Sequence, residues 1–326
     1  MLGVPQVWAA MRAGILRQVA RHPAPVRWLF HAAVAAKAWL APRGLPARVL
    51  DAVVFRRTRA ATGGRLKLAI TGGAPISAPM QAFIAAAVCP VLHGYGLTEA
   101  SGLVAVQLPG DASLANVGAP VPSVEVKLVD VPGAGYYAAN QQGEICVRGP
   151  SVFRGYLDGS CDALDADGWL RTGDVGQWVA GGRLAVIDRI RNLIKLASGE
   201  FVALEALEAA YAASAHVAHV CVVADARMRR PCALVSLVAD EHHVDHVDRA
   251  TADEVFADLL AAGRAAGLPP PHMLAQIRID PEPWTAENGL LTAASKLRRA
   301  AIHKRNERLL RDMYEVMDQR GERIAL

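Results

Sequence analysis

The segment "LKLAITGGAPISAPMQAFIAAAVCPVLHGYGLTE" (66–99) indicates the fold class of this chain. Two short apolar runs, 66–73 and 89–96, each end in glycines, and an apolar stretch of helical length separates them. A strand, a helix and a second strand in this order are typical of a parallel α/β unit. Because glycine lets the backbone approach a neighbour closely, the turn after each strand is a candidate for ligand binding.

Bulk composition is typical of a globular protein. The chain has 326 residues, of which 52% are hydrophobic and 20% charged, so we expect about two domains. The net charge of +4 is small for this length and does not predict a nucleic-acid partner. Five scattered cysteines without a C-x-x-C pair favour buried thiols in a reducing compartment over disulfides or a zinc site.

Neither a membrane span nor a secretion signal is predicted. No apolar stretch reaches the 18 or more residues that a spanning helix needs, since Lys37 and Pro42 interrupt the alanine-rich segment 32–41. The first residues, "MLGVPQVWAAMRAG", lack a basic region followed by an apolar one. We therefore expect a protein that is not secreted.

The front of the chain is predicted to be helical. Over 5–60 prolines interrupt the pattern, and apolar residues recur at helical spacing so that one face packs on a sheet. These residues are Val7, Trp8, Met11, Ile15 and Val19.

After residue 116 the residue pattern of the sequence changes twice. Short β-like runs over about 117–187 predict an antiparallel or barrel-like subdomain. After Asp188 a helix (203–214), two strands (217–225 and 232–240) and further helices predict a compact α+β domain. The domains expected are thus 1–188, made of an α/β unit to about 116 and the β subdomain, and 189–326, which ends in a basic helix over 295–314.

The stretch "HGYGLTE" (93–99) carries the clearest chemistry. Gly94 and Gly96 leave room on either side of Tyr95 for a planar ring. Thr98 and Glu99 supply a hydroxyl and a carboxylate, which a phosphate with Mg²⁺ requires.

Two other residues permit two interpretations each. Asp174, between glycines at a predicted strand end in "DGWLRTGDVG" (167–176), could accept both hydroxyls of a ribose or belong to an ordinary Asp-Gly turn. Lys296, in "ENGLLTAASKLRR" (287–299), could serve a site or be one solvated cation of a basic helix.

Taken in order, several segments resemble the successive motifs of the AMP-forming acyl-CoA synthetases, or adenylate-forming enzymes. They are "TGGAPIS", "GYGLTE", "GEICVRGPSVFRGY", "GWLRTGD", "DRIRNLIKLASGEFVALEALE" and "ENGLLTAASKLRR". Within that group "LIKLASGE", "NGLLT" and "GYYAANQQGEICVRGPSVFRGY" look most like the long-chain fatty acid–CoA ligases of the fungal type. The resemblance covers residues 5 to about 315.

The resemblance implies roles for the matching residues of the first domain. The turn at Gly72, Gly73 and Ala74 would lie along the adenine, with Tyr95 and Gly96 beside its ring. Thr98 would hold the phosphate and Glu99 the Mg²⁺, while Asp174 and Arg189 would bind the ribose.

It also implies roles in the second domain, which would rotate about a hinge at Asp188–Arg191 between two half-reactions. Lys296 would neutralise the α-phosphate and substrate carboxylate as the adenylate forms. The segment with Lys195, Gly199 and Glu200 would face the CoA thiol in the second state.

The implied reaction activates a long-chain fatty acid with ATP to acyl-AMP and then transfers it to CoA, releasing AMP and pyrophosphate. Mg²⁺ is the implied metal, and no nucleic-acid or specific protein partner is implied. The resemblance is compatible with peripheral attachment on the cytoplasmic side of the endoplasmic reticulum, lipid droplets or other membranes.

The chain departs from this family in one respect. The 326 residues hold no Ser/Thr/Gly-rich phosphate loop ending in Pro-Lys-Gly, so we expect an N-terminally truncated enzyme with little or no ligase activity of its own. The alternative is a non-catalytic fragment or sensor that binds AMP or CoA.

Two further segments each permit more than one interpretation. Residues 241–249, "EHHVDHVDR", bring together His242, His243 and His246 with Glu241, Asp245 and Asp248, which is compatible with a metal site or with a solvated polar loop. The basic C-terminal segment is compatible with nucleic acid, an anionic membrane, or a packed closing helix.

Overall fold

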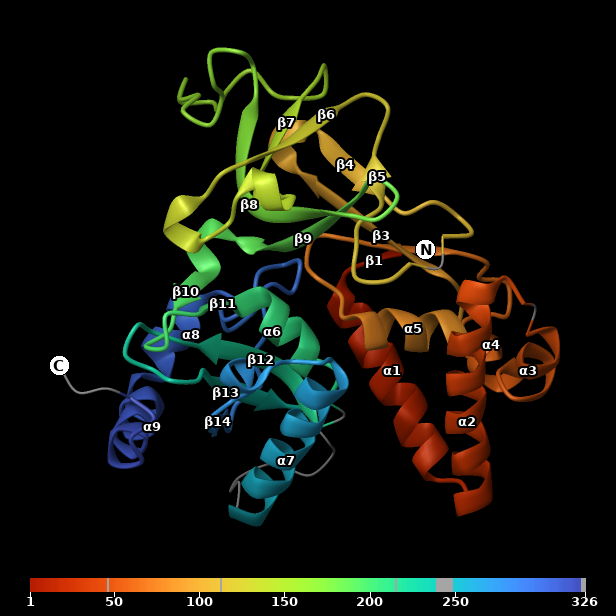
Figure 1. Cartoon of the computed structure of the whole chain (residues 1–326). Coiled ribbons are helices and arrows are strands. Elements are labelled where there is room, and N and C mark those ends of the chain that lie inside the picture. The colour runs from red at the N-terminus through yellow and green to blue at the C-terminus, as the bar shows by residue number, and fades with distance from the viewer. Residues whose placement is uncertain (46, 112, 215, 239–248, 324–326) are drawn as a thin grey trace. The chain divides into compact units, whose positions relative to one another are not determined.

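The computed structural model describes residues 1–45, 47–111, 113–214, 216–238 and 249–323. The chain forms two compact units, Met1–Ile190 and Arg191–Leu326 (Figure 1), which are described separately below. The division lies two residues beyond the boundary predicted at Asp188. The histidine cluster predicted around 241–248 falls outside the described residues.

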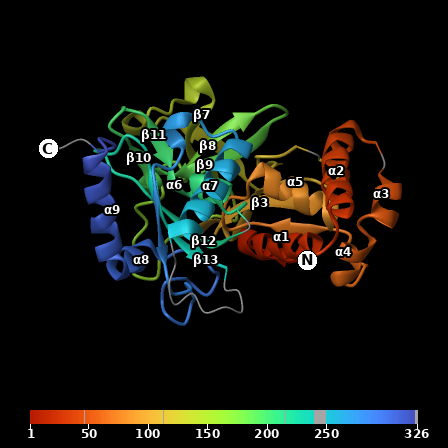
Figure 2. The ribbon, with the colours of Figure 1, turned by 90° about the horizontal axis from the view of Figure 1, so that it is seen from below.

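The first unit begins with helices that cover a mixed sheet. Its five strands follow one another in order, parallel from the first to the third and antiparallel from there to the fifth. Helix α5 packs against β3 on one face of the sheet, and α1 and α2 pack against α5 on that side (Figures 1 and 2). The strands are β1 (Leu2–Gly3), β2 (Ala69–Thr71), β3 (Val91–Leu97), β4 (Gly102–Val106) and β5 (Ala119–Pro120); the helices are α1 (Pro5–Ala20), α2 (Ala24–Leu40), α3 (Arg48–Val53), α4 (Arg56–Ala61) and α5 (Ala78–Ala87), with short 3₁₀ turns η1 (Ala41–Arg43) and η2 (Thr98–Ala100).

The predicted strand, helix and strand over 66–96 are confirmed as β2, α5 and β3, and the two strands pair in parallel. The helical prediction for 5–60 is also confirmed, since helices α1 to α4 occupy most of this range. Proline stands at the start of α1 and in the first turn of α2, where its missing N–H costs nothing. Trp8 is fully buried. Val7, which was assigned to the same inner face, is 39% exposed, so that assignment was wrong.

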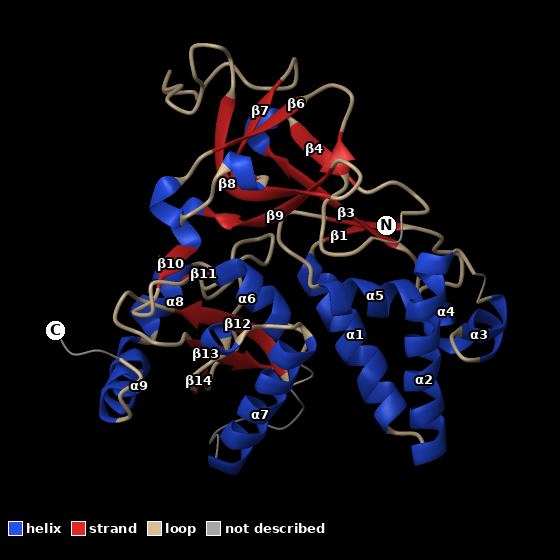
Figure 3. Ribbon diagram, in the orientation of Figure 1, coloured by secondary structure: helices blue, strands red, loops and turns tan. Residues whose placement is uncertain are grey.

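The second part of this unit is a four-stranded antiparallel sheet, as the β-rich texture of 117–187 predicted (Figure 3). Neighbours in sequence are neighbours in the sheet, so it is built from successive antiparallel connections. Its strands are β6 (Glu125–Val129), β7 (Gln142–Arg148), β8 (Leu170–Val179) and β9 (Arg183–Arg189), with 3₁₀ turns η3 (Pro132–Ala134) and η4 (Ala138–Asn140).

The second unit is the α+β module expected from the sequence, with three short strands that were not predicted. The third strand, β14, pairs in parallel with β13, and a separate hairpin joins β10 to β11. Its elements are η5 (Ile190–Asn192), β10 (Leu193–Lys195), β11 (Phe201–Ala203), α6 (Leu204–Tyr211), β12 (Val217–Val223), β13 (Cys232–Leu237), α7 (Arg249–Ala265), η6 (Pro270–His272), β14 (Ile277–Asp280), α8 (Arg299–Arg305) and α9 (Glu307–Gln319).

The predicted basic helix over 295–314 was wrong in extent. The structure has two helices there, which meet at Asn306, and the first begins only at Arg299. Lys296 therefore precedes the helix. Ile302 and Leu310 are buried in the core of this unit, and Arg299 forms an ion pair of 2.7 Å with Glu208 of α6.

All five cysteines are free thiols, and four of them are buried, with Cys161 the exposed exception. Within the described part of the chain, no helix combines the length and apolar character required to cross a bilayer.

Candidate active site

The glycine-containing turn that follows β2 lies beside the glycines within β3. Thr71, the last residue of β2, pairs with His93 of β3, so the turn at Gly72–Ala74 lies beside the middle of "HGYG". A Cβ on Gly72 would stand 3.0 Å from the carbonyl oxygen of Gly94, and Gly73 has φ +81°. Only residues without a side chain fit this approach comfortably, and ligands of α/β sheets bind at such strand ends.

A buried polar network holds this turn, and it centres on His93. The His93 ring lies against the backbone of Ala74 and of Asn116, and its backbone N–H donates to Oε1 of Gln107 at 2.8 Å. The same oxygen accepts from Nε2 of Gln81 at 2.8 Å. Sequence reasoning did not single out these residues, although His93 stands at the head of the glycine motif.

Burial lowers the pKa of His93 to about 4, which makes stability depend on pH. In the unfolded chain an ordinary histidine titrates near 6.5, so the unfolded state binds more protons between these values. The stabilisation is present above about pH 6.5 and is lost as pH falls towards 4, by up to about 3 kcal/mol.

Urea unfolding of the wild type and of His93→Gln between pH 7 and pH 4 checks this. We expect the variant to show a shallower loss of stability on acidification, with His31→Gln, which changes an exposed histidine, behaving as the wild type. Equal slopes in all three proteins would contradict a buried neutral imidazole.

Tyr95, Asp174 and Arg189 come together in the first unit. The Tyr95 hydroxyl donates to Oδ2 of Asp174 at 2.6 Å, and Nε of Arg189 lies 3.5 Å from Oδ1 of the same carboxylate. Burial, followed by the charge of Asp174, raises the pKa of Tyr95 above its ordinary value. The phenol is thus a neutral donor that orients the Asp174 carboxylate.

Asp174 does not stand at a strand end as predicted, but within β8. Its cross-strand partner is Arg189, which explains why the two side chains meet. The preceding bend is held by Glu144, a buried carboxylate that accepts from the backbone N–H of Gly173 at 3.1 Å and from Nε of Arg171 at 2.9 Å. Gly173 has φ +72°, a conformation that favours glycine.

Thr98 and Glu99 lie on the 3₁₀ turn that follows β3. The Thr98 side chain is exposed and Glu99 is half-buried. Oε1 of Glu99 accepts a hydrogen bond of 2.8 Å from the hydroxyl of Tyr156, a residue that was not predicted although it ends the quoted segment "GPSVFRGY". The turn therefore offers one oriented carboxylate next to an accessible hydroxyl.

This donor set is suited to a Mg²⁺ ion that is held mainly by a phosphate ligand. Among the described residues, no group of three histidine, cysteine or acidic side chains could enclose a metal. Mg²⁺ in phosphate-handling sites is commonly bound through one or two carboxylates, with phosphate oxygens and water completing its shell.

Lys296 lies in the second unit, on a tight turn. Its backbone N–H donates to Oγ1 of Thr292 at 3.1 Å, the Thr292 N–H donates to its carbonyl at 2.8 Å, and Ser295 has φ +57°. Its side chain is exposed. Leu291 and Leu297 form a bridge that closes this turn.

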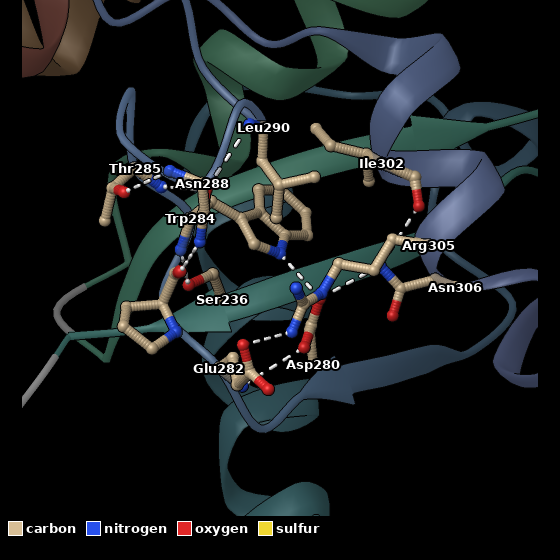
Figure 4. A network of polar contacts seen from close by, with 11 residues as sticks. Ser236, Asp280, Glu282, Trp284, Thr285, Asn288, Leu290, Ile302, Arg305 and Asn306 are labelled. Atoms are coloured by element: carbon tan, nitrogen blue, oxygen red, sulfur yellow. Dashed lines mark hydrogen bonds and ion pairs between the residues drawn. The ribbon is translucent and has the colours of Figure 1, made fainter.

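The segment before this turn is anchored by a buried polar network (Figure 4). The Asp280 carboxylate accepts from Nε1 of Trp284 at 2.8 Å and from Nδ2 of Asn306 at 2.9 Å, and Nε of Arg305 lies 3.4 Å from it. Glu282 pairs with Nη2 of the same Arg305 guanidinium. Strand β14, the following loop and the start of α9 are thereby joined.

The remaining predicted residues form the tip of the hairpin between β10 and β11. Lys195 pairs with Phe201, and Gly199 has φ +90° in the connecting turn. Lys195, Gly199 and Glu200 are all exposed. The structure thus gathers Tyr95, Asp174 and Arg189 in the first unit, whereas this tip and Lys296 belong to the second.

Known proteins resemble the chain in both sequence and fold. Residues 1–157 match the family described as AMP-binding enzyme. Long-chain-fatty-acid–CoA ligase 2 of Schizosaccharomyces pombe is 37% identical over 93% of this chain and 48% of its own length. Long-chain-fatty-acid–CoA ligase 1 of Saccharomyces cerevisiae is 36% identical over 93% of this chain and 46% of its own length.

Among solved structures, the adenylation domain of a carboxylate reductase from Mycobacterium chelonae superposes with a TM-score of 0.78 at 29% identity, covering 96% of this chain and 46% of that one. The corresponding domain from Segniliparus rugosus, in complex with AMP and a co-purified carboxylic acid, gives 0.74 at 27% identity and covers 97% of this chain and 47% of that one.

The chain spans about half the length of the relatives it matches. Its motifs, its fold and its similarity over 93% of its residues agree. The chain is therefore similar to the AMP-binding enzymes over residues 1–157 and to the long-chain-fatty-acid–CoA ligases over most of its own length.

Proposed function

We propose that this chain is the AMP-binding and C-terminal portion of an enzyme that activates a long-chain fatty acid with ATP and transfers it to CoA. The observation that supports this most directly is the Asp174 carboxylate, held by the Tyr95 hydroxyl at 2.6 Å and by Arg189 at 3.5 Å. An oriented carboxylate beside an aromatic ring, with a glycine turn and a glycine-containing strand nearby, is suited to the ribose and adenine of a nucleotide.

In this proposal the first unit binds the nucleotide. Asp174 accepts hydrogen bonds from the ribose hydroxyls, and Arg189, 3.5 Å away, orients its carboxylate. Tyr95 presents its ring to the adenine. The turn at Gly72–Ala74, together with Gly96, leaves room for the adenine ring. Fixed orientation of the bound nucleotide is a main contribution that such a site makes to rate.

Thr98 and Glu99 would hold the phosphate and Mg²⁺, respectively. The metal, when bound, would neutralise phosphate charge as pyrophosphate departs. Tyr156, which donates to Oε1 of Glu99, restricts the rotation of that carboxylate and leaves it facing one way before the metal arrives.

The second unit would supply different residues to the two half-reactions. Lys296, as an exposed ammonium on a closed turn, would neutralise the α-phosphate and the fatty-acid carboxylate during adenylation. The hairpin tip with Lys195, Gly199 and Glu200 would serve CoA in thioester formation. The division at Ile190–Arg191 lies within the hinge Asp188–Arg191 that this scheme requires.

The same proposal includes peripheral attachment to the cytoplasmic face of membranes, such as those of the endoplasmic reticulum or lipid droplets. A substrate with a long acyl chain partitions into bilayers, so an enzyme at the surface encounters it at high local concentration.

A second function is a binding protein or sensor that retains AMP or CoA without turnover. The chain covers 48% of the S. pombe relative, and no Ser/Thr/Gly-rich loop ending in Pro-Lys-Gly occurs in its sequence. Donors for the β- and γ-phosphates would then come from elsewhere, and pyrophosphate departure from this chain alone would lack them.

Calorimetry with AMP tests the nucleotide site. We expect Asp174→Asn to weaken AMP binding at least about tenfold, because a neutral amide replaces a charge-assisted acceptor. Asp167→Asn, in an exposed turn, is the matched control and should bind as the wild type does. Equal affinity for AMP in all three proteins would show that Asp174 does not take part in AMP binding.

Pyrophosphate release distinguishes the enzyme from the sensor. With ATP, Mg²⁺ and a long-chain fatty acid, we expect binding but slow release from this chain, and further loss in Lys296→Ala. Robust fatty-acid-dependent release would contradict the expected weak activity, while calorimetric heat with no release at all would favour the sensor.

A further inference from the structure

Charge is distributed very unevenly along this chain. Residues 1–67 contain twelve lysines and arginines and a single acidic residue, Asp51, whereas the whole chain has 35 basic and 31 acidic residues. Asp51 is itself engaged, because it pairs with Lys37 of α2 and lies 3.4 Å from Arg59 of α4. The surface of this region therefore carries cations without local counter-charges.

Apolar exposure is concentrated in the same region. Ten of the sixteen large apolar side chains exposed in the described part of the chain lie between residues 1 and 53. In α2 the inner face buries Phe30 and Ala33, while Trp28 and Trp39 are 72% and 57% exposed. Since eleven residues make about three helical turns, the two tryptophans lie on one stripe that faces away from the core.

Helix α3 repeats this pattern on a smaller scale. Val49 and Val53, one turn apart, are 75% and 72% exposed and share a face. Between the two helices, the Arg43 guanidinium stacks on the Trp39 ring at 3.9 Å and donates to the Trp39 carbonyl at 2.7 Å. The exposed cations of the region are Arg17, Arg21, Arg27, Arg43, Arg48, Arg56, Arg57, Arg65 and Lys67.

A helix with apolar residues on two opposite faces needs a second apolar environment. Charge complementarity indicates which one, because exposed tryptophans flanked by arginines partition into the boundary between lipid headgroups and acyl chains, and cations accumulate on anionic leaflets. Exposed valines beside Arg48 and Arg56 follow the same rule.

We propose that α2, η1 and α3 form a docking face for an anionic lipid bilayer, with Trp28 and Trp39 inserted at the headgroup level. This deepens the membrane attachment proposed above and names its surface and its lipid charge. Membrane docking requires no catalysis. Absence of vesicle binding would therefore leave the proposed nucleotide site unaffected, and absence of AMP binding would leave the proposed docking face unaffected.

Co-sedimentation of the full chain with vesicles tests the docking face. We expect binding to phosphatidylcholine vesicles that contain about one third phosphatidylserine, and binding at least about tenfold weaker to pure phosphatidylcholine. Raising the salt concentration from about 0.05 to 0.5 M should weaken the anionic binding, because screening shortens the reach of the charges. Equal binding to both vesicles, or to neither, would overturn the proposal.

The tryptophans are tested with a double variant. Trp28→Ser/Trp39→Ser should reduce vesicle binding at least about tenfold. Leu108→Ser/Leu157→Ser removes two apolar side chains that are 64% and 107% exposed elsewhere in the unit and should leave binding unchanged. An equal effect of the two double variants would contradict a specific face.

Charge is tested in the same way with two triple variants. Each cation near an anionic surface contributes about a fivefold change in binding, so removing three from the docking face should weaken binding about a hundredfold. Removing three exposed cations from the C-terminal helices should have little effect. If this second variant lost more vesicle binding than the first, membrane binding would be assigned to the C-terminal helices. The variants are Arg27→Gln/Arg43→Gln/Arg48→Gln and Lys304→Gln/Arg308→Gln/Arg311→Gln.

A measurement on the wild type keeps the proposal testable if a variant fails to fold. Trp28 and Trp39 are the two tryptophans with large exposure among the described residues, so vesicles brominated near the headgroups should quench part of the emission. No quenching would overturn the proposal. A dimer in solution that dissociates in the double tryptophan variant, without vesicle binding, would assign the face to a second copy.

Discussion

Replacing Asp280 by alanine is expected to lower the free energy of unfolding of the second unit by about 3–5 kcal/mol. The carboxylate is only 4% exposed and accepts hydrogen bonds from Trp284 and Asn306. Its loss leaves the buried indole N–H of Trp284 and one of the two N–H groups of the Asn306 amide without an acceptor, and Arg305 without its inner partner. Unsatisfied buried donors are among the largest causes of destabilisation by single substitutions.

The matched control is Glu282→Ala, which removes the outer partner of the same arginine. The Glu282 side chain is 65% exposed, and a solvent-exposed pair contributes at most about 1 kcal/mol. Urea unfolding followed by near-ultraviolet circular dichroism, to which Trp284 contributes, compares the two. If both variants lost the same stability, Asp280 would not be the centre of the network.

Gly96→Ala is expected to have the largest effect on the first unit. A Cβ at this position would lie 1.8 Å from the carbonyl oxygen of Gly102 and 3.1 Å from Cα of Leu103. Because these are backbone atoms, β4 must shift, and we expect a loss of about 3 kcal/mol or more, at the top of the range for overpacking. Tyr95 and Thr98 flank this bend, so AMP binding should fall as well.

Gly133→Ala is the control, since its Cβ would meet no atom within 4 Å and it lies in a surface 3₁₀ turn. Thermal unfolding and AMP calorimetry on both variants provide the comparison. Unchanged stability and affinity in Gly96→Ala would show that the bend between β3 and β4 tolerates a side chain, contrary to the close approach observed.

Much of the secondary structure was predictable because its signals are local. Apolar periodicity with prolines identified the helices before residue 61, and glycines marked the ends of β2 and β3. Strand β14 was missed, since four residues, Ile277–Asp280, carry little periodic signal. The side of α1 that buries Trp8 but exposes Val7 depends on where α5 and the sheet lie.

The division of the C-terminal helix illustrates the same limit. Nothing in the local pattern of 295–314 requires an end at residue 306. Nδ2 of Asn306 donates to Asp280, 26 positions earlier, and to the carbonyl of Ile302. A long-range hydrogen bond therefore accompanies the break, and periodicity cannot report such a contact.

For the candidate site, the sequence by itself determined the residue types and their order, because the glycine turns and the motif carboxylates are local in sequence. Only the tertiary structure decided their partners. The register of β8 with β9 places Asp174 opposite Arg189, and folding brings Tyr156 to Glu99 across 57 positions. Strand register and loop closure depend on packing between distant segments, so these contacts arise only when the sheets assemble.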